Sequence, residues 1–288
     1  MLSTTPLDGP FGVRIDGLDL RAPVADDVMR DVLRAFYDNL LIVIPGQDLT
    51  PVEFERFARG FGTPHPHVLS HRRMPGLPGV MAISNLVDDD GTPVHGFNGA
   101  AFWHTDQSYE AEPSSATMLY AVAAPATGGR TLIANLHAAY DALDDAMKAR
   151  LDGLTAIHLY GNRDEDAPGE LPASALRDDA QRAAVPACRH PLVRRHPVTG
   201  RKALYAVAGT SRGIEGMAEP DALALLAELK AFATQGRFVT GHRYTVGDVA
   251  IWDTAATLHK AERIGPATGA HDTRFHYRVT VKGRPPLM

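Results

Sequence analysis

A histidine and an aspartate stand two residues apart in the run Phe102-Trp103-His104-Thr105-Asp106. If this run is extended, alternate side chains face the same side, so His104 and Asp106 point into one pocket. An imidazole and a carboxylate are both ligands for divalent metal ions, and two histidines with one carboxylate are typical of non-haem Fe(II) oxygenases. The pair alone is weak support, because a chain with 13 histidines is expected to contain one by chance.

The third ligand of such a site has to come from another part of the chain. Our candidate is His259, which lies shortly after the strand-like run of residues 247–253. A histidine near the end of a second strand would complete a set of two histidines and one carboxylate. His190 and His196 are not candidates for the third ligand, because each is followed by proline and is interpreted as a turn residue.

The last strand-like segment, residues 274–282, is a separate sign of chemistry. One face carries Arg274, His276, Arg278, Thr280 and Lys282, and the other carries Phe275, Tyr277, Val279 and Val281. The apolar face is expected to join the core, so the polar face is turned either to solvent or to an anion-binding pocket. Two guanidinium groups four residues apart can each bind a carboxylate or sulfonate with two hydrogen bonds.

Composition narrows the function classes. The formal net charge of −5 and the pI of about 6.2 argue against a nucleic acid or an anionic membrane as partner. Cys188 is the one cysteine, which excludes an internal disulfide and suits a reducing compartment, so a cytoplasmic location is expected. We find no signal-peptide pattern and no apolar run of membrane-spanning length. Whether the chain acts as a monomer or a homo-oligomer stays open.

The elements that must position these residues are mainly strands. Helical periodicity occurs in residues 26–40, after residues 50–53, in residues 138–151 and in residues 219–235. The sequence Thr50-Pro51-Val52-Glu53 predicts a capping box. Strands are predicted at residues 11–17, 41–44, 80–84, 117–122, 131–136, 154–160 and in much of 238–282, with a hairpin formed by 190–193 and 202–207.

This order of elements favours a mainly β fold with flanking helices (α+β), namely a β-sandwich or jelly roll with helices packed outside. We see no linker, so residues 1–288 are expected to form a single domain. Two irregular stretches, about 62–100 and 161–187, are expected to form active-site loops.

The ordered set of motifs resembles the TauD/TfdA family of Fe(II)- and 2-oxoglutarate-dependent dioxygenases. The likeness rests on four pieces in order: Trp103-His104-Thr105-Asp106, Gly128-Gly129-Arg130-Thr131, the run 248–253 with His259, and Arg274 followed by Arg278. It implies a double-stranded β-helix (jelly-roll) core. His104, Asp106 and His259 are then the iron ligands, and Thr131 and Arg274 hold the distal carboxylate of 2-oxoglutarate. His67 and Arg278 match positions that bind the anionic group of the substrate.

The chain departs from taurine dioxygenase at the contacts to the substrate amine. An asparagine is replaced by Ala100, and the tyrosine after the matched histidine is missing, with Ser70 nearest. Taurine itself is therefore not the expected substrate. The resemblance implies hydroxylation of another small organic anion (an aryloxyalkanoate, alkyl sulfate or sulfonate) with O2, giving succinate and CO2.

Three alternatives remain open at this stage. The same chemistry can act on an amino acid or a natural-product intermediate. A His/Asp/His site can also hold zinc in a hydrolase, and a jelly roll can be a non-catalytic binding protein. Neither of the last two needs a second anion site beside the metal, so Thr131 and Arg274 argue against both.

Overall fold

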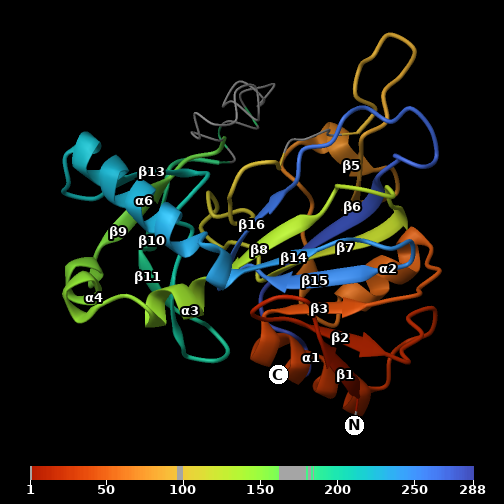
Figure 1. Ribbon diagram of the computed structural model, residues 1–288, viewed down its shortest axis with the longest axis horizontal. Helices are drawn as coiled ribbons and strands as arrows, with labels where there is room; N and C mark the ends of the chain where they lie inside the picture. Colours follow the sequence, from red (N-terminus) through yellow and green to blue (C-terminus); the bar gives the residue numbers. More distant parts are fainter. Residues whose placement is uncertain (1, 96–99, 162–179, 181–182, 184) are drawn as a thin grey trace.

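The computed structural model describes the chain except residues 1, 96–99, 162–179, 181–182 and 184. Its largest sheet runs in the order β1-β2-β3-β15-β7-β17-β6-β5, with β4 paired to β17. The strands are β1 Ser3–Pro6, β2 Val13–Asp16, β3 Leu41–Ile44, β4 Thr63–Pro64, β5 Arg73–Met74, β6 Leu77–Ser84, β7 Ala116–Ala123, β15 Val249–Asp253 and β17 Phe275–Lys282. The pairs are antiparallel apart from β2 with β3. Strands far apart in sequence therefore lie side by side (Figure 1).

A smaller antiparallel sheet completes the roll. It has the order β14-β8-β16, formed by β14 Val239–His242, β8 Thr131–Asn135 and β16 Thr257–Ala261. Ile133 of β8 packs in one cluster with inward-facing residues of the large sheet, including Leu119 of β7 and Trp252 of β15. The two sheets thus enclose a common interior, which agrees with the expected mainly β, jelly-roll architecture.

Alternation along the strands separates this interior from a second, outer core. In β15, Val249 and Ile251 belong to the outer cluster, whereas Ala250 and Trp252 belong to the inner one. Val279 and Val281 of β17 also face outward into the helix-covered core. The polar face of the same strand must therefore point into the roll, because successive side chains alternate.

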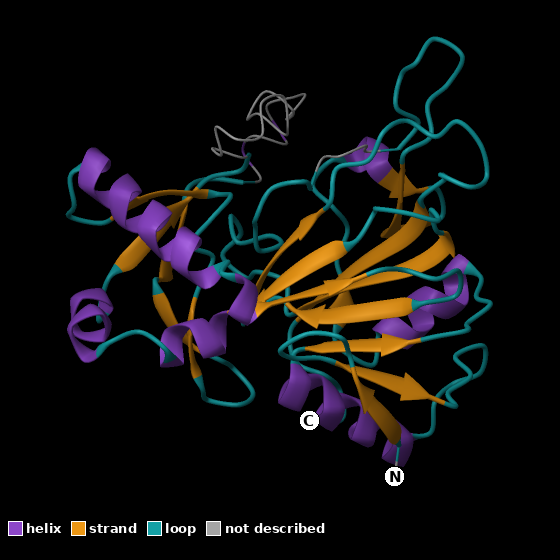
Figure 2. Cartoon of the chain, in the orientation of Figure 1, coloured by secondary structure: helices purple, strands orange, loops and turns teal. Residues whose placement is uncertain are grey.

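Two helices cover the outer face of the large sheet. Helix α1 (Asp26–Asn39) and helix α2 (Pro51–Ala58) bury Phe36 and Phe54 in the outer cluster with the strand residues. The capping box at the start of α2 is confirmed: the Thr50 hydroxyl accepts from the Glu53 N–H, and the Glu53 carboxylate accepts from the Thr50 N–H. Figure 2 shows these helices outside the strands.

The remaining elements pack on the outer face of the small sheet. They are α3 Leu136–Asp141, α4 Asp145–Leu151, β9 Thr155–His158, β10 Cys188–Pro191, β11 Val193–Arg195, β12 Lys202–Leu204, β13 Ser211–Ile214 and α6 Glu219–Ala233, with a short 3-10 turn at Gly236–Phe238. A second 3-10 turn, Ser70–Arg72, directly precedes β5 of the large sheet. Ala134 of β8 and Leu258 of β16 join their cluster, which includes Leu225 and Leu229 of α6. Among the described residues, no helix is long and apolar enough to cross a membrane.

Four local predictions need correction. The single helix expected at 138–151 is two helices, because Asp144 caps α4 by accepting from the Met147 N–H. The expected hairpin exists, but it pairs Val193–Arg195 with Lys202–Leu204. His190 is not a turn residue, since it lies within β10, which pairs with β9. The expected loop at 62–100 contains β4, β5 and β6, and most of residues 161–187 lie outside the described part of the chain.

Candidate metal centre and active-site pocket

Two of the proposed ligands are neighbours through the backbone. His104 and His259 form an isolated antiparallel bridge, in which each N–H donates to the carbonyl of the other at 3.0 and 2.8 Å. The Thr105 hydroxyl donates to the Thr257 carbonyl at 2.9 Å and extends this contact. The segment before β7 is thereby tied to β16, although the two histidines are 259 − 104 = 155 residues apart.

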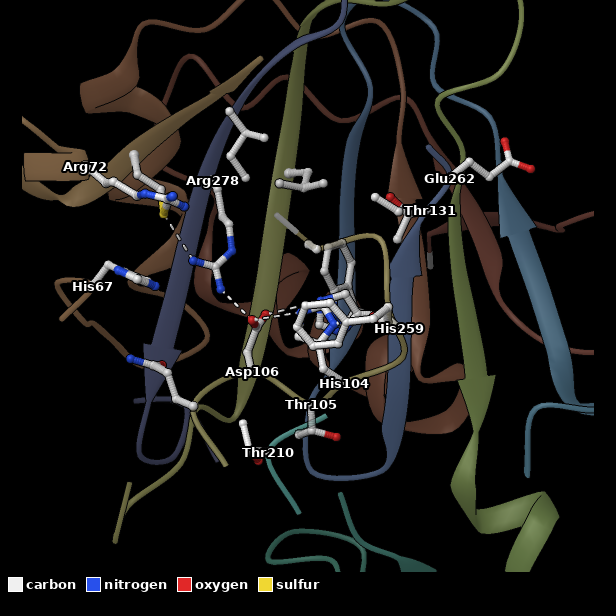
Figure 3. A pocket seen from close by; sticks show the side chains of 18 of the residues that line it. His67, Arg72, His104, Thr105, Asp106, Thr131, Thr210, His259, Glu262 and Arg278 are labelled. Atoms are coloured by element: carbon white, nitrogen blue, oxygen red, sulfur yellow. Dashed lines mark hydrogen bonds and ion pairs between the residues drawn. The ribbon is translucent and has the colours of Figure 1, made fainter. Parts of the chain in front are cut away.

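The donor atoms converge as a metal site requires. The His104 Nε2 lies 3.7 Å from the Asp106 Oδ1, and the His259 Nε2 lies 3.5 Å from the Asp106 Oδ2. Ligand atoms of the three residues all fall within 4.8 Å of one another. Bonds of about 2.0–2.2 Å, as nitrogen and oxygen form with zinc, allow one ion to reach all three. Figure 3 shows Asp106 between the two histidines and Arg278.

The protonation states also suit metal binding. The His104 Nδ1 lies 2.8 Å from the Phe102 carbonyl, so Nδ1 must carry the proton and Nε2 presents its lone pair. Burial lowers the pKa of His104, and burial with the neighbouring His104 lowers the pKa of His259 further. Burial alone would raise the pKa of Asp106, but Arg278 and both histidines hold it below its usual range. Two neutral imidazoles and one carboxylate result, which is the form that binds metals.

Aromatic rings enclose the histidines. Trp252 lies against His259 with ring centroids 4.8 Å apart, and Phe102 lies against His104 at 4.9 Å. Trp252 is 1% exposed, so it shields this side of the site from water. A dry wall strengthens the electrostatic interactions of the charged groups inside.

A buried cation stands on one side of the ligands. Arg274 is 6% exposed, burial lowers its pKa, and its Nε has no hydrogen-bond partner. No carboxylate in the described chain pairs with it, and its guanidinium lies 6.0 Å from the ring centroid of Tyr244. Thr131 also lines the pocket, and its hydroxyl lies 3.0 Å from the Tyr244 hydroxyl. A buried arginine without an anion is an unfavourable arrangement that a bound anion would relieve.

A second group of donors stands on the other side. Arg278 donates from Nη2 to the Asp106 Oδ1 at 2.7 Å, and its Nη1 contacts the Met81 sulfur at 3.2 Å. The His67 Nδ1 accepts from the Leu69 N–H, which leaves Nε2 as the protonated donor nitrogen. Burial, with the positive charges of Arg278 and Arg72, lowers the pKa of His67 to about 3, so this imidazole is neutral. Thr131 and Glu262 lie on the opposite side of the ligands from His67 and Arg72 (Figure 3).

One cavity joins both sides, and most of its wall away from the metal is apolar or aromatic. Met81, Ile83, Phe102, Tyr109, Leu119, Tyr160 and Ile264 contribute to this wall. Ala100 lines the cavity without a polar group, and Ser70 is exposed and does not line it. The amine contacts of taurine dioxygenase therefore have no replacement at these two positions.

Sequence reasoning missed three residues beside the site. Thr117 donates to the Asp106 carboxylate, Tyr244 contacts Thr131, and Asn85 holds the loop before β17. Asn85 is 1% exposed; its amide nitrogen donates to the Gly265 and Asp272 carbonyls, and its amide oxygen accepts from the Arg274 N–H. Inward-facing positions on alternating strands were the available signal for Thr117, but nothing in the sequence pairs it with Asp106.

The fold and the site together define a class of protein. A jelly-roll interior with two histidines and one carboxylate is the arrangement of the non-haem iron oxygenases. The model of the taurine catabolism dioxygenase TauD, TfdA family matches residues 3–280. The chain belongs to this family and is a 2-oxoglutarate-dependent dioxygenase, which uses Fe(II), 2-oxoglutarate and O2.

Similar proteins support the same class. An alpha-ketoglutarate-dependent 2,4-dichlorophenoxyacetate dioxygenase of Cupriavidus pinatubonensis is 32% identical over 267 residues, covering 90% of this chain and 91% of the relative. An alpha-ketoglutarate-dependent sulfate ester dioxygenase of Pseudomonas putida is 30% identical, covering 99% and 91%. The crystal structure of AAD-2 in complex with Mn(II) and N-oxalylglycine is 29% identical with a TM-score of 0.80, covering 100% of this chain and 99% of AAD-2.

Proposed function

We propose that this dioxygenase hydroxylates a small organic anion, with separate sites for the cosubstrate and the substrate. His104, Asp106 and His259 bind Fe(II), Thr131 and Arg274 hold the distal carboxylate of 2-oxoglutarate, and His67 and Arg278 bind the anionic group of the substrate. The observation that carries the proposal is that Arg274, immediately before β17, and Arg278, within β17, both line the cavity that contains the His/Asp/His cluster. Bound Fe(II) with 2-oxoglutarate supplies the activation of O2 for oxidation of a substrate C–H bond.

The cosubstrate role of Arg274 is supported by its missing partner. A carboxylate can take two hydrogen bonds from one guanidinium, and this geometry favours arginine over lysine. The Thr131 hydroxyl, which lines the same cavity, adds one further donor. Because Arg274 is buried, its charge is weakly screened and acts strongly on an anion bound beside it.

The substrate role of His67 and Arg278 is supported by their donor atoms. Arg278 keeps one amino group on Asp106 and has further N–H groups for an oxyanion. The His67 Nε2–H adds a neutral donor. The apolar and aromatic wall suits an aryl group, so we favour an aryloxyalkanoate over an alkyl sulfate or sulfonate, and we exclude taurine from the proposed substrates.

The alternatives fit the cavity less well. An amino acid or natural-product intermediate would use the same grip on a carboxylate but would place polar groups against the apolar wall. A zinc hydrolase or a non-catalytic binding protein would leave the buried Arg274 without a partner, which is costly.

We further propose that residues 1–288 form a single domain, that the substrate is a small molecule and that the enzyme is cytoplasmic. The family match over residues 3–280 supports the first point. The negative formal charge disfavours nucleic acids and anionic membranes, and the single cysteine suits a reducing compartment. The proposal makes no choice between monomer and homo-oligomer.

The test separates the two arginines. Arg278→Ala should raise the KM for an aryloxyacetate at saturating Fe(II) by about 30-fold or more, with a much smaller change in the Kd of N-oxalylglycine. Arg274→Ala should do the reverse, and the exposed Arg14→Ala should change neither. Succinate formation and product release are measured across aryloxyacetates, alkyl sulfates, sulfonates and amino acids. Equal losses of both affinities in both variants would contradict the division of roles, and turnover of the amino acids alone would contradict the substrate class.

A further inference from the structure

The Asp106 carboxylate is held at both oxygens by side chains that are not metal ligands. The Thr117 hydroxyl lies 2.6 Å from the Oδ2, and the Arg278 Nη2 lies 2.7 Å from the Oδ1. The Ser114 hydroxyl binds the Asp106 carbonyl at 3.0 Å and fixes the backbone. Arg278 also faces the substrate side of the cavity. Thr117 is therefore the donor in the described chain that serves Asp106 without a second task.

We propose that Thr117 is a positioning residue for the metal centre, fixing the rotation of the Asp106 carboxylate. The inference rests on the proposed role of Asp106 as a metal ligand and goes beyond it. Thr117 is not part of the four motifs that resemble the family, and it lies within strand β7.

The direction of the hydrogen bond follows from the chemistry of the two groups. An ionised carboxylate only accepts, so the Thr117 hydroxyl must donate its proton to the Asp106 Oδ2. A hydrogen bond of 2.6 Å from a hydroxyl to a charged oxygen belongs to the short, charge-assisted kind.

The scaffold holds the donor rigidly. Thr117 is fully buried in β7, where it pairs with Trp252 of β15 on one side and with Thr280 of β17 on the other. A β-branched side chain in a strand has few accessible rotamers, so the hydroxyl is already aimed at Asp106 before any metal binds. The Asp106 carboxylate then keeps its remaining lone pairs available between His104 and His259, because rotation would break the bond to Thr117.

Partners that orient a metal ligand typically contribute about 10- to 100-fold to metal affinity. Thr117→Val removes the hydroxyl and keeps the shape, so we expect the Kd for Mn(II) to rise by about 10- to 100-fold. Thr117→Ser keeps the hydroxyl and should retain most of the affinity. Thr280→Val is the matched control, because Thr280 lies directly opposite Thr117 and is 3% exposed, and its hydroxyl faces the His65 carbonyl at 3.5 Å.

The experiment measures free Mn(II) by electron paramagnetic resonance during titration of the full chain, with the unfolding temperature of the metal-free protein recorded for each variant. If Thr117→Val fails to fold, Thr117→Ser and Thr117→Ala replace it, since these two differ only in the hydroxyl. A Kd in Thr117→Val no higher than in Thr280→Val, or equal affinities of the Ser and Ala variants, would overturn the inference. Asp106→Ala tests the metal site separately from the role of Thr117. If this variant retains the Mn(II) affinity of the wild type, the proposed metal site itself is refuted.

Discussion

Replacement of Arg274 by methionine should have opposite effects on stability and on cosubstrate binding. Arg274 is 6% exposed, has no carboxylate partner in the described chain, and its guanidinium lies 6.0 Å from the centroid of the Tyr244 ring. A buried ion carries a penalty of several kcal/mol, and a cation–π contact returns about 0.5–2 kcal/mol. The terminal nitrogens face a cavity that water can enter, which lowers the penalty. A net cost of about 1 kcal/mol or more remains in the cosubstrate-free protein.

Methionine matches the length of the apolar stem and removes the charge. Without 2-oxoglutarate and with metal chelated, Arg274→Met should be more stable by about 1 kcal/mol, or about 2 °C in Tm. Arg278→Met is the contrasting variant, because it leaves the Asp106 carboxylate without its arginine and should lose about 3 kcal/mol. Urea unfolding of the three proteins measures both differences.

A bound cosubstrate analogue should reverse this order of stability, so that the wild type becomes more stable than Arg274→Met. Removal of a buried charge partner costs at least about 2 kcal/mol in binding, so the Kd of N-oxalylglycine for the Mn(II)-loaded Arg274→Met protein should rise about 30-fold or more. At 100 times the wild-type Kd, the ligand should stabilise the wild type by about 2.7 kcal/mol and the variant far less. If Arg274→Met is destabilised as strongly as Arg278→Met without ligand, the view of Arg274 as an unpaired buried cation is wrong.

Three further predictions concern residues around the cavity. Burial and the neighbouring His190 lower the pKa of His158 to about 3. Below about pH 6.5 the unfolded chain therefore binds more protons at this residue than the folded protein does. The free energy of unfolding should fall by about 1.4 kcal/mol per pH unit as the pH drops from 6 to 4. His158→Asn should flatten that slope in urea unfolding, and an unchanged slope would contradict the cause. Tyr244→Phe removes the hydroxyl beside Thr131 and should raise the Kd of N-oxalylglycine about 5- to 10-fold at constant Mn(II) affinity; an unchanged Kd would mean that Thr131 needs no orientation. His259→Ala should weaken Mn(II) binding more than about 100-fold with an unchanged circular dichroism spectrum, because its bridge to His104 is formed by the backbone; loss of the fold would refute this separation.

Sequence patterns predicted the parts of the fold that depend on local periodicity. The helix at 26–40, the capping box at Thr50 and the alternation along residues 274–282 were all visible in the sequence, and the structure agrees with each. The break between α3 and α4 was not visible in the sequence. It arises because the Asp144 side chain binds a backbone N–H and starts a new helix, and hydrophobic periodicity carries no information about such a cap.

The site was predictable where residue type limits the chemistry. Histidines and carboxylates at the ends of strands indicate a metal, and paired arginines indicate anions. His196 illustrates the limit: it lies at a turn as expected, where its Nδ1 accepts from the Val198 and Thr199 N–H groups, but its Nε2 also contacts the buried Asp253 at 2.9 Å. This partner is 57 residues away. Such pairings depend on how strands meet in three dimensions, so one sequence does not reveal them.

The backbone bridge between His104 and His259 also has a consequence for the order of assembly. The two residues close a segment of more than 150 residues, and long-range contacts of this kind form late in folding because loop closure is entropically costly. An ion therefore cannot nucleate this fold as zinc does in a zinc finger, where binding and folding are one event. Newly made protein should fold first and acquire iron afterwards, so cells short of iron would accumulate an intact apoenzyme that is ready for loading.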